Sequence, residues 1–282
     1  MVTTEQMSVV YRRPPLRYLQ LPGGAVPVYS DRDAYIANYE KISEDHVAHM
    51  DKTGLNPFMA EELWLASEQV TERLVRKHGI SGARVLDVGC GLGRLLSRFP
   101  EFDRYGMDIS PSYLQYAQRE GINLCLARIE DMPYADNYFD LVICTDVLEH
   151  VFDLYAACTQ LLRVTRPGGI LVVRTPYREN LSTYLSPDLP YDYVHVRNFD
   201  EDSLRLMFEK IHGNQVIEIM KGPLLIPWVS PRCSLQVPGL GRLFRLAARA
   251  SRLGGRSFHE TFLRWAFDPS EINIAVRVNV DG

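Results

Sequence analysis

The chain has 282 residues, of which 46% are hydrophobic and 23% charged, and its formal net charge at pH 7 is −4. This composition is typical of a globular protein large enough for one domain with additions. The acidic balance argues against a protein held to nucleic acid by phosphate neutralisation, so we expect no nucleic-acid partner.

The cysteines and the terminus indicate the compartment. Five cysteines are scattered without a C-x-x-C pair, which favours neither a zinc site nor a disulfide framework. The first residues, M-V-T-T-E-Q-M, lack the basic start and apolar core of a signal peptide. No apolar run is long enough to span a membrane. We therefore expect a reduced, cytoplasmic protein.

The first part of the chain is expected to be partly helical. Residues 1–30 are rich in Pro, Gly and Tyr and predict a tail or a small hairpin. Residues 31–50 have a helical pattern in which Tyr35 and Tyr39 share one face. A second helix is expected from about residue 58 to residue 77, where basic residues precede a glycine.

Strands and helices then alternate. Short apolar runs predict strands at 84–88, 105–109, 122–126, 141–144 and 170–173. Helical patterns occur near 92–98, 113–119 and 154–164, and Pro167-Gly168-Gly169 is expected to form a stop before the fifth strand. A helix at 200–210 and strands at 215–220 and 272–280 complete the pattern. Apolar strands joined by helices indicate an α/β protein with a parallel sheet covered on both faces.

The segment V-L-D-V-G-C-G-L-G at 85–93 predicts a nucleoside site. An apolar strand runs into a turn with glycines on alternate positions, and glycine lets a ligand lie against the backbone. Asp108 follows at the end of the next strand, in Y-G-M-D-I, where its carboxylate can accept from the hydroxyls of a ribose.

Two cofactors compete for this turn. A nicotinamide-binding turn prefers G-x-G-x-x-G, with a pyrophosphate at the helix N-terminus, whereas the spacing here is G-x-G-x-G. Asp87, two residues before the first glycine, would repel a pyrophosphate but suits a ligand that carries an ammonium and a sulfonium. S-adenosylmethionine is such a ligand.

Four motifs, in this order along the chain, resemble those of a known protein family. They are V-L-D-V-G-C-G-L-G, Y-G-M-D-I-S, E-D-M-P-Y-A-D-N-Y-F-D-L-V-I-C-T-D-V-L-E-H-V and L-L-R-V-T-R-P-G-G-I-L-V-V. The segment from Val85 to about Thr175 resembles the core of class I S-adenosylmethionine-dependent methyltransferases, within the type-11 group that includes ubiquinone-pathway and sugar methyltransferases. The resemblance implies a Rossmann-like, doubly wound sheet of seven strands whose last strand is antiparallel. It also implies that the helix with Tyr35 and Tyr39 is a lid over the cofactor.

The resemblance implies how the glycine turn would hold the cofactor. The methionine part of S-adenosylmethionine would lie beside Gly89 and Gly91, in the turn that also contains Cys90 and Gly93. Asp87 would anchor its amino group. Cys90 is expected to be a small filler rather than a nucleophile.

The nucleoside part would lie further along the sheet edge. The resemblance implies that Asp108 holds both ribose hydroxyls, that Ile109 packs on the adenine face, and that Ile129 and Glu130 meet the adenine edge. Many relatives have Gly-Asp where this chain has Ala127-Arg128. An arginine cannot accept a hydrogen bond from the adenine amino group, so that contact must come from elsewhere.

The acceptor side offers histidines as candidate bases. Thr145 and Asp146 would line the methionine side of the site, and residues 176–199 would help to build the acceptor pocket. We expect His195 to be the general base, with a structural or lid role as the alternative; His150 is the second candidate, with ordering of the loop as its alternative. A metal-dependent catechol-type mechanism needs converging acids and an Asn after the fourth strand, which are not apparent, so no metal is expected.

Residues 223–268 differ in composition from the rest. They contain seven arginines against two acids, and between 240 and 253 leucines and arginines fall on opposite helical faces. Three interpretations stay open for 240–256: a cap with a solvated arginine face, a peripheral contact with a membrane surface, or recognition of an anionic lipid or other anionic acceptor.

These patterns predict residues 1–57 as an N-terminal extension with a helical lid and residues 58–282 as the methyltransferase domain, with 223–268 as an insertion. The expected activity is transfer of a methyl group from S-adenosylmethionine to an O or N atom of a small molecule, such as a glycan or a lipid-linked intermediate. The alternatives are a non-catalytic cofactor-binding partner or regulatory protein, or an NAD-dependent oxidoreductase or epimerase. The segment after the fourth strand, C-T-D-V-L-E-H, lacks the tetrad used to methylate a flipped base.

Overall fold

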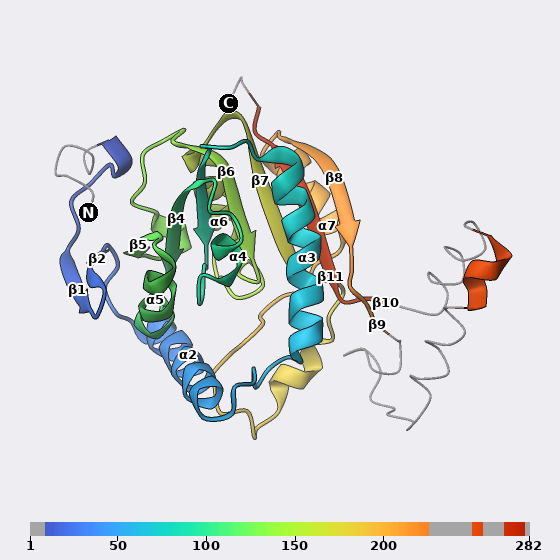
Figure 1. The fold of residues 1–282 in the computed structure, drawn as a ribbon, viewed down its shortest axis with the longest axis horizontal. Helices are drawn as coiled ribbons and strands as arrows, with labels where there is room; N and C mark the ends of the chain where they lie inside the picture. Colours follow the sequence, from blue (N-terminus) through green and yellow to red (C-terminus); the bar gives the residue numbers. More distant parts are fainter. Residues whose placement is uncertain (1–8, 226–249, 256–267, 280–282) are drawn as a thin grey trace.

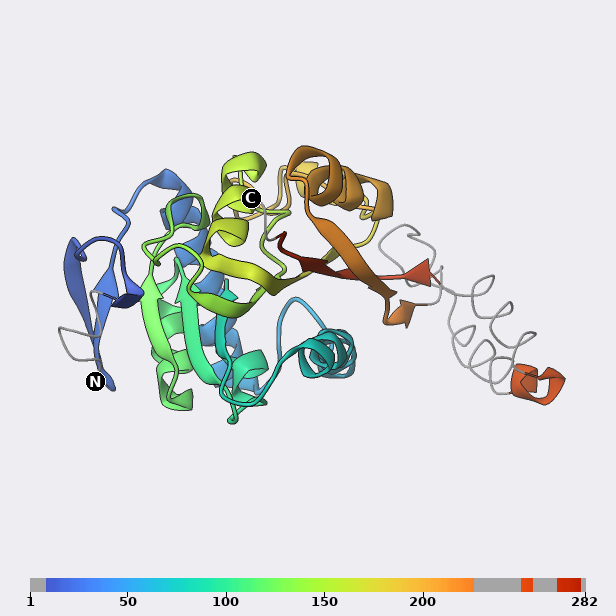
Figure 2. The same cartoon turned by 90° about the horizontal axis from the view of Figure 1, so that it is seen from above.

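A computed structural model describes residues 9–225, 250–255 and 268–279 of the chain. A twisted β-sheet lies at its centre, and helices cover both faces of this sheet (Figures 1 and 2). The expected α/β class is therefore confirmed. In the part of the chain that the structure describes, no helix is long and apolar enough to cross a membrane.

Seven strands make up the main part of the sheet, and five adjacent ones run parallel. In spatial order they are β5 (Asn123–Leu126), β4 (Asp103–Asp108), β3 (Arg84–Val88), β6 (Phe139–Thr145), β7 (Thr165–Pro176), β11 (Glu271–Arg277) and β8 (Gln215–Lys221). Strand β11 is antiparallel to both neighbours, as expected for the last strand. The chain moves outwards from β3 to β5 and then returns to β6 beside β3. Sheets of this kind bind ligands at such a switch point, outside the carboxyl ends of the strands.

Two more strands extend the sheet beyond β5, so the expected count of seven is wrong. Strands β1 (Arg17–Leu21) and β2 (Gly24–Val28) form an antiparallel hairpin, which confirms the hairpin expected near the N-terminus. Val28 pairs with Leu126 in parallel orientation, and nine strands result. The hairpin covers backbone groups that an edge strand would otherwise leave open.

The helices form one layer on each face of the sheet (Figure 2). Apolar side chains of α3 (Glu61–His78), α4 (Arg94–Ser97) and α5 (Pro111–Ala117) belong to one core cluster. Those of α6 (Leu154–Val164) and α7 (Glu201–Arg205) belong to the other. The central strands are buried between these layers, which is why their sequences show little polar alternation.

Helix α2 (Ala34–Thr53) lies near α5, away from the two layers (Figure 1). It begins after Asp33, whose side chain accepts a hydrogen bond from the backbone N–H of Ile36, and it ends at Gly54, whose φ of 73° suits a helix C-terminus. The hydroxyl groups of Ser43 and Ser110 are 2.5 Å apart and join α2 to the N-cap of α5.

Strand β7 begins at Thr165 and not after the expected Pro167-Gly168-Gly169 stop. Gly168 has a φ of 72°, and the pairing of β6 with β7 shifts register between Phe139 and Leu141. Pro167, Gly168 and Gly169 therefore form an irregularity inside strand β7 and do not interrupt it. The helix expected at 200–210 begins as α7 and continues as a π-helical segment, Leu206–Ile211.

The ends of the insertion are paired. Strand β9 (Leu224–Leu225) is antiparallel to β10 (Asp268–Pro269), and a short 3₁₀ turn covers Arg252–Gly254. Most of the segment with leucines and arginines on opposite faces, and with it the predicted membrane or anion contact through 240–256, lies outside the described residues.

Candidate functional site

A cavity of about 300 Å³ opens at the switch point, beside the carboxyl ends of β3, β4 and β6. All but one of the predicted cofactor-binding residues line it, namely Asp87, Gly89, Cys90, Gly91, Asp108, Ile109, Ile129, Glu130, Thr145 and Asp146. Of the two predicted bases, His150 lines the cavity and His195 does not. The sequence thus predicted which residues meet here, whereas their contacts with a cofactor stay a prediction.

The glycine turn after β3 is shaped by close contact with the loop after β6. Gly89 has a φ of 73°, and a Cβ at this position would lie 2.2 Å from Cγ2 of Val147. Gly91 has a φ of 51°, and a Cβ there would meet no atom within 4 Å. Both positions favour glycine through their backbone conformation, and Gly91 in addition leaves open space beside the cavity.

Gly93, the remaining predicted cofactor-binding residue, does not line the cavity, and its contact with a cofactor stays a prediction. It is the N-cap of α4, with a φ of 77°, and a Cβ there would lie 3.0 Å from Cα of Ala117. Gly93 is therefore required for the close packing of α4 against α5. The alternate spacing of the glycines in the sequence could not separate this role from ligand contact.

Asp108 ends β4 and fixes the glycine turn from the opposite side. Its Oδ2 accepts a hydrogen bond of 2.9 Å from the N–H of Gly91, and its Oδ1 accepts one of 2.9 Å from the N–H of Ser110. Burial raises the pKa of this carboxyl, and the two backbone donors oppose the shift. Each oxygen keeps a further lone pair, so the carboxylate can still accept from two hydroxyl groups.

Asp87 is a buried acid without a full set of partners. It lies in β3, its side chain lines the cavity, and its Oδ1 has no hydrogen-bond partner among the described residues. Burial raises the pKa of Asp87 to about 8, and the charge of Arg174 partly opposes the shift. A cationic ligand would stabilise the ionised form of this side chain.

The loop after β6 carries Asp146, which has a φ of 56°. Its carboxylate accepts two hydrogen bonds from Arg174, a buried side chain of the neighbouring strand β7. The sheet register places Arg174 beside Asp146, because Arg174 of β7 pairs with Thr145 of β6. This arginine was not predicted for the site, because a charged residue inside an apolar strand carries no sign of its partner.

The predicted adenine end is bounded by Ile109, Ile129 and Glu130. The guanidinium of Arg128 lies 4.5 Å from the centre of the Tyr35 ring and donates a hydrogen bond of 2.5 Å to Asp33. Arg128 therefore joins the α2 region to this end of the cavity.

Helix α2 lines the cavity with one of its faces. Tyr35, Tyr39, Ile42 and His46 lie on one face of the helix, and all four line the cavity. The helix is also bonded to the segment 190–194: the side chain of Asn38 donates to the carbonyl of Tyr193 and accepts from the N–H of Asp192. The position of α2 agrees with the predicted lid, whereas its movement stays a prediction.

The charge of the cavity favours a cation. Its lining includes five carboxylates, from Glu68, Asp87, Asp108, Glu130 and Asp146, and three guanidinium groups, from Arg94, Arg128 and Arg174. Glu68 and Arg94 form an ion pair, with Nε and Oε1 3.2 Å apart, and Arg94 lies over the ring of Trp64. These residues were not predicted for the site, because Trp64 and Glu68 come from α3 and only the tertiary structure brings them beside Arg94.

His150 and His195 lie next to each other. Their ring centres are 4.6 Å apart. The Nδ1 of His150 lies 3.0 Å from the carbonyl oxygen of Val194, and the Nδ1 of His195 bonds to Glu179 and to the hydroxyl group of Tyr184. Burial, reinforced by His195, lowers the pKa of His150 to about 4, so its ring is neutral at pH 7.

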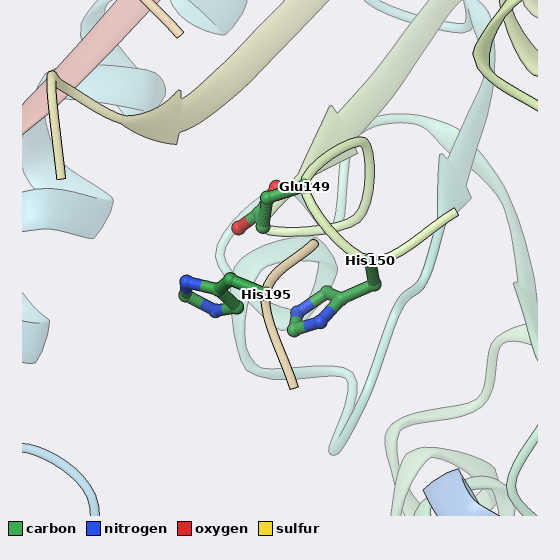
Figure 3. A group of neighbouring side chains, drawn as sticks. All are labelled: Glu149, His150 and His195. Atoms are coloured by element: carbon green, nitrogen blue, oxygen red, sulfur yellow. The ribbon is translucent and has the colours of Figure 1, made fainter. Parts of the chain in front are cut away.

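Glu149 lies beside these histidines and is fully buried (Figure 3). Burial, reinforced by the charge of Asp146, raises its pKa well above the usual range. One potential ligand atom from each of Glu149, His150 and His195 lies within 4.8 Å of the others, although no metal was expected from the sequence. Glu149 and His150 are adjacent in the sequence, whereas His195, the third residue of this cluster, comes from a distant segment.

The chain was compared with known proteins. A family model described as a methyltransferase domain matches residues 86–173. An uncharacterized methyltransferase of Schizosaccharomyces pombe is 32% identical over 133 residues, which cover 41% of this chain and 48% of the relative. A ubiquinone biosynthesis O-methyltransferase of Bradyrhizobium is 30% identical over 157 residues, which cover 50% of this chain and 61% of that protein. The chain thus spans about half the length of the curated relatives it matches.

The fold is also similar to solved structures. The crystal structure of an S-adenosylmethionine-dependent methyltransferase from Thermotoga maritima matches with a TM-score of 0.57 at 15% identity, covering 87% of this chain and all of the other. This likeness concerns the fold, and it confirms the Rossmann-like architecture. Residues 86–173 thus match the methyltransferase-domain family, and the fold of the chain is similar to that of S-adenosylmethionine-dependent methyltransferases.

Proposed function

We propose that the chain transfers a methyl group from S-adenosylmethionine to an O or N atom of a small molecule. The observation that carries this proposal is the acidic cavity at the switch point, where Asp87 and Asp108 flank the glycine turn. Asp87 has an unpaired carboxylate oxygen among the described residues, which suits the ammonium group of the methionine part. A dinucleotide would instead bring a pyrophosphate to this acid.

The predicted contacts agree with this arrangement. The methionine part would lie along Gly89, Gly91 and Thr145, near the acid of Asp87. The ribose hydroxyls would donate to the free lone pairs of Asp108. The adenine would lie between the apolar side chains of Ile109 and Ile129. The Oε1 of Glu130, which has no partner in the described part of the chain, would accept from its amino group.

The acceptor would enter beside α2 and His150. A lone pair of its O or N atom attacks the methyl carbon, the C–S bond electrons return to sulfur, and S-adenosylhomocysteine results. Alignment of the two molecules in the cavity supplies much of the rate enhancement. When the Nδ1–H of His150 donates to the Val194 carbonyl, its Nε2 keeps a lone pair and can take the acceptor proton. His195 is not among the lining residues, so we place His150 before it as the base, in contrast to the order expected from the sequence.

Two measurements, made one after the other, test the proposal. Calorimetry should show binding of S-adenosylhomocysteine and no comparable binding of NAD; tight binding of NAD alone would contradict it. Radiolabelled methyl groups should then be transferred to a panel of phenols, alcohols and amines. Phenols come first, because one relative is a ubiquinone biosynthesis O-methyltransferase. Cofactor binding without transfer to any acceptor would instead favour a non-catalytic binding protein.

A further inference from the structure

We propose that Glu149, His150 and His195 bind a divalent transition-metal cation at the acceptor side of the cavity. Glu149 and His150 come from the loop after β6, and His195 comes from the segment before α7 (Figure 3). One potential ligand atom from each lies within 4.8 Å of the others. The proposal concerns metal binding by the chain itself and does not depend on methyl transfer.

The first argument is the environment of Glu149. The residue has a relative exposure of 0%, and neither carboxylate oxygen has a hydrogen-bond partner among the described residues. A buried polar group without partners is costly, because it has lost water and gained nothing in return. An ion held by this carboxylate would remove the cost.

The second argument is the charge around it. The carboxylates of Asp146, Glu179 and Glu271 all interact with Glu149 through their charge. Arg174 is the nearby guanidinium, and it is already bonded to Asp146. Glu271 is itself buried, and its Oε2 has no partner among the described residues. A bound cation would balance this excess of buried acid.

The third argument is the orientation of the histidines. The Nδ1 of His195 bonds to the carboxylate of Glu179, and the Nδ1 of His150 bonds to the carbonyl of Val194. Metal-binding histidines are usually held in this way by a carboxylate or a backbone carbonyl, which leaves the second ring nitrogen as the ligand. Among the described residues the hydrogen bonds of both rings are made by Nδ1, so both Nε2 atoms are left as ligands. A bound ion would occupy the lone pair of His150 Nε2, so His150 would act as the base only in the metal-free chain.

The ligand set indicates the kind of ion. Two imidazoles with one carboxylate suit Zn²⁺, Fe²⁺, Co²⁺ or Mn²⁺ better than Mg²⁺ or Ca²⁺, which prefer oxygen ligands. Bonds of about 2.1 Å place tetrahedral ligand atoms roughly 3.4 Å apart, so modest side-chain rotations would close the site. Because His150 also lines the cavity, the remaining coordination positions would be available to an acceptor oxygen.

The test uses the full chain without an affinity tag, stripped of metal by a chelator. Titration with Zn²⁺ in the calorimeter, and with Co²⁺ followed by visible absorption, should show one saturable site. Glu149→Gln and His195→Ala should each lower the affinity by at least tenfold. Glu179→Gln should lower it about 10- to 100-fold through the orientation of His195. His49→Ala removes an exposed histidine outside the cluster and should leave the affinity unchanged.

Thermal unfolding of each variant separates loss of the site from loss of the fold, and Zn²⁺ should raise the midpoint of the wild type but not that of His195→Ala. The proposal is wrong if the folded wild type shows no saturable site. It is equally wrong if the cluster variants bind as the His49 variant does. Neither result would affect binding of S-adenosylhomocysteine, so the proposed methyl transfer can stand or fall separately.

Discussion

Gly89 and Val147 are so close that a side chain on Gly89 would overlap Val147: a Cβ would lie 2.2 Å from Cγ2 of the valine. Gly89 belongs to the turn after β3, and Val147 belongs to the loop after β6. Both residues line the cavity, so glycine at position 89 lets the turn after β3 and the loop after β6 approach each other closely there.

The first prediction concerns this contact. Gly89→Ala should lower the affinity for S-adenosylhomocysteine at least tenfold, because the new methyl group displaces Val147 and the turn. It should also lower the free energy of unfolding by roughly 1–3 kcal/mol, since the φ of 73° is strained for alanine. Calorimetry and chemical denaturation measure the two effects.

Gly82→Ala is the matched control for backbone strain. Gly82 has a φ of 79°, and a Cβ there would meet no atom within 4 Å. This variant should lose stability but keep the affinity of the wild type. Equal affinities for the two variants would mean that the contact between Gly89 and Val147 does not shape the ligand site.

The second prediction concerns Asp108. Asp108→Ala should weaken binding of S-adenosylhomocysteine about tenfold or more, because a hydrogen bond to a charged group contributes about 1.5–3 kcal/mol. Asp103→Asn, at the other end of β4, should bind as the wild type does. Unchanged affinity of folded Asp108→Ala would overturn the assignment of the ribose.

The third prediction concerns pH and Asp87. Its pKa of about 8 in the free protein lies above the value of about 3.9 in an unfolded chain. The native state therefore binds the extra proton between these values, and this group makes the protein less stable as pH rises from about 4 to 8. The ammonium of the cofactor favours the ionised carboxylate, so binding should release a proton below pH 8 and tighten as pH rises towards 8.

Calorimetry in buffers with different ionisation enthalpies measures this release. Asp87→Asn should lose the part of the proton release that comes from the Asp87 carboxyl. Its affinity for the cofactor product should also depend less on pH between 6 and 8, because the pKa of Asp87 is about 8. If the wild type and Asp87→Asn release the same number of protons, the released proton comes from another group.

The fourth prediction concerns the bond between Arg174 and Asp146. Arg174→Lys keeps the charge but cannot provide the planar fork that donates to both oxygens of the aspartate. The free energy of unfolding should fall by about 1–3 kcal/mol, because the buried guanidinium of Arg174 loses hydrogen bonds. Arg166→Lys, at a partly exposed ion pair with Asp140 near the start of the same strand, should change stability by less than about 1 kcal/mol. Equal losses in the two variants would contradict a special role for Arg174.

The local sequence was sufficient to place the seven strands of the main part of the sheet, although not all of their bounds, and to find the glycine turn of the site. Helix α6 and strand β3 have the predicted bounds, because their apolar patterns and flanking residues are local signals. The position of Asp87, Gly91 and Asp108 at the carboxyl edge of the sheet followed from strand order, since parallel strands place their ends together. Only the structure showed that Gly93 packs against α5 and does not line the cavity, because a glycine needed for helix packing looks the same in sequence as one needed by a ligand.

The sequence by itself determined an α/β sheet with a glycine turn and an acid at the end of the next strand, because propensity and hydrophobic period act over a few residues. Only the tertiary structure decided that the hairpin joins the sheet through Val28, that Arg174 holds Asp146, and that Glu149 and His150 meet His195. These contacts join residues far apart in the chain. Their geometry depends on sheet register and on the path of connecting segments, which leave no periodic signal in the sequence.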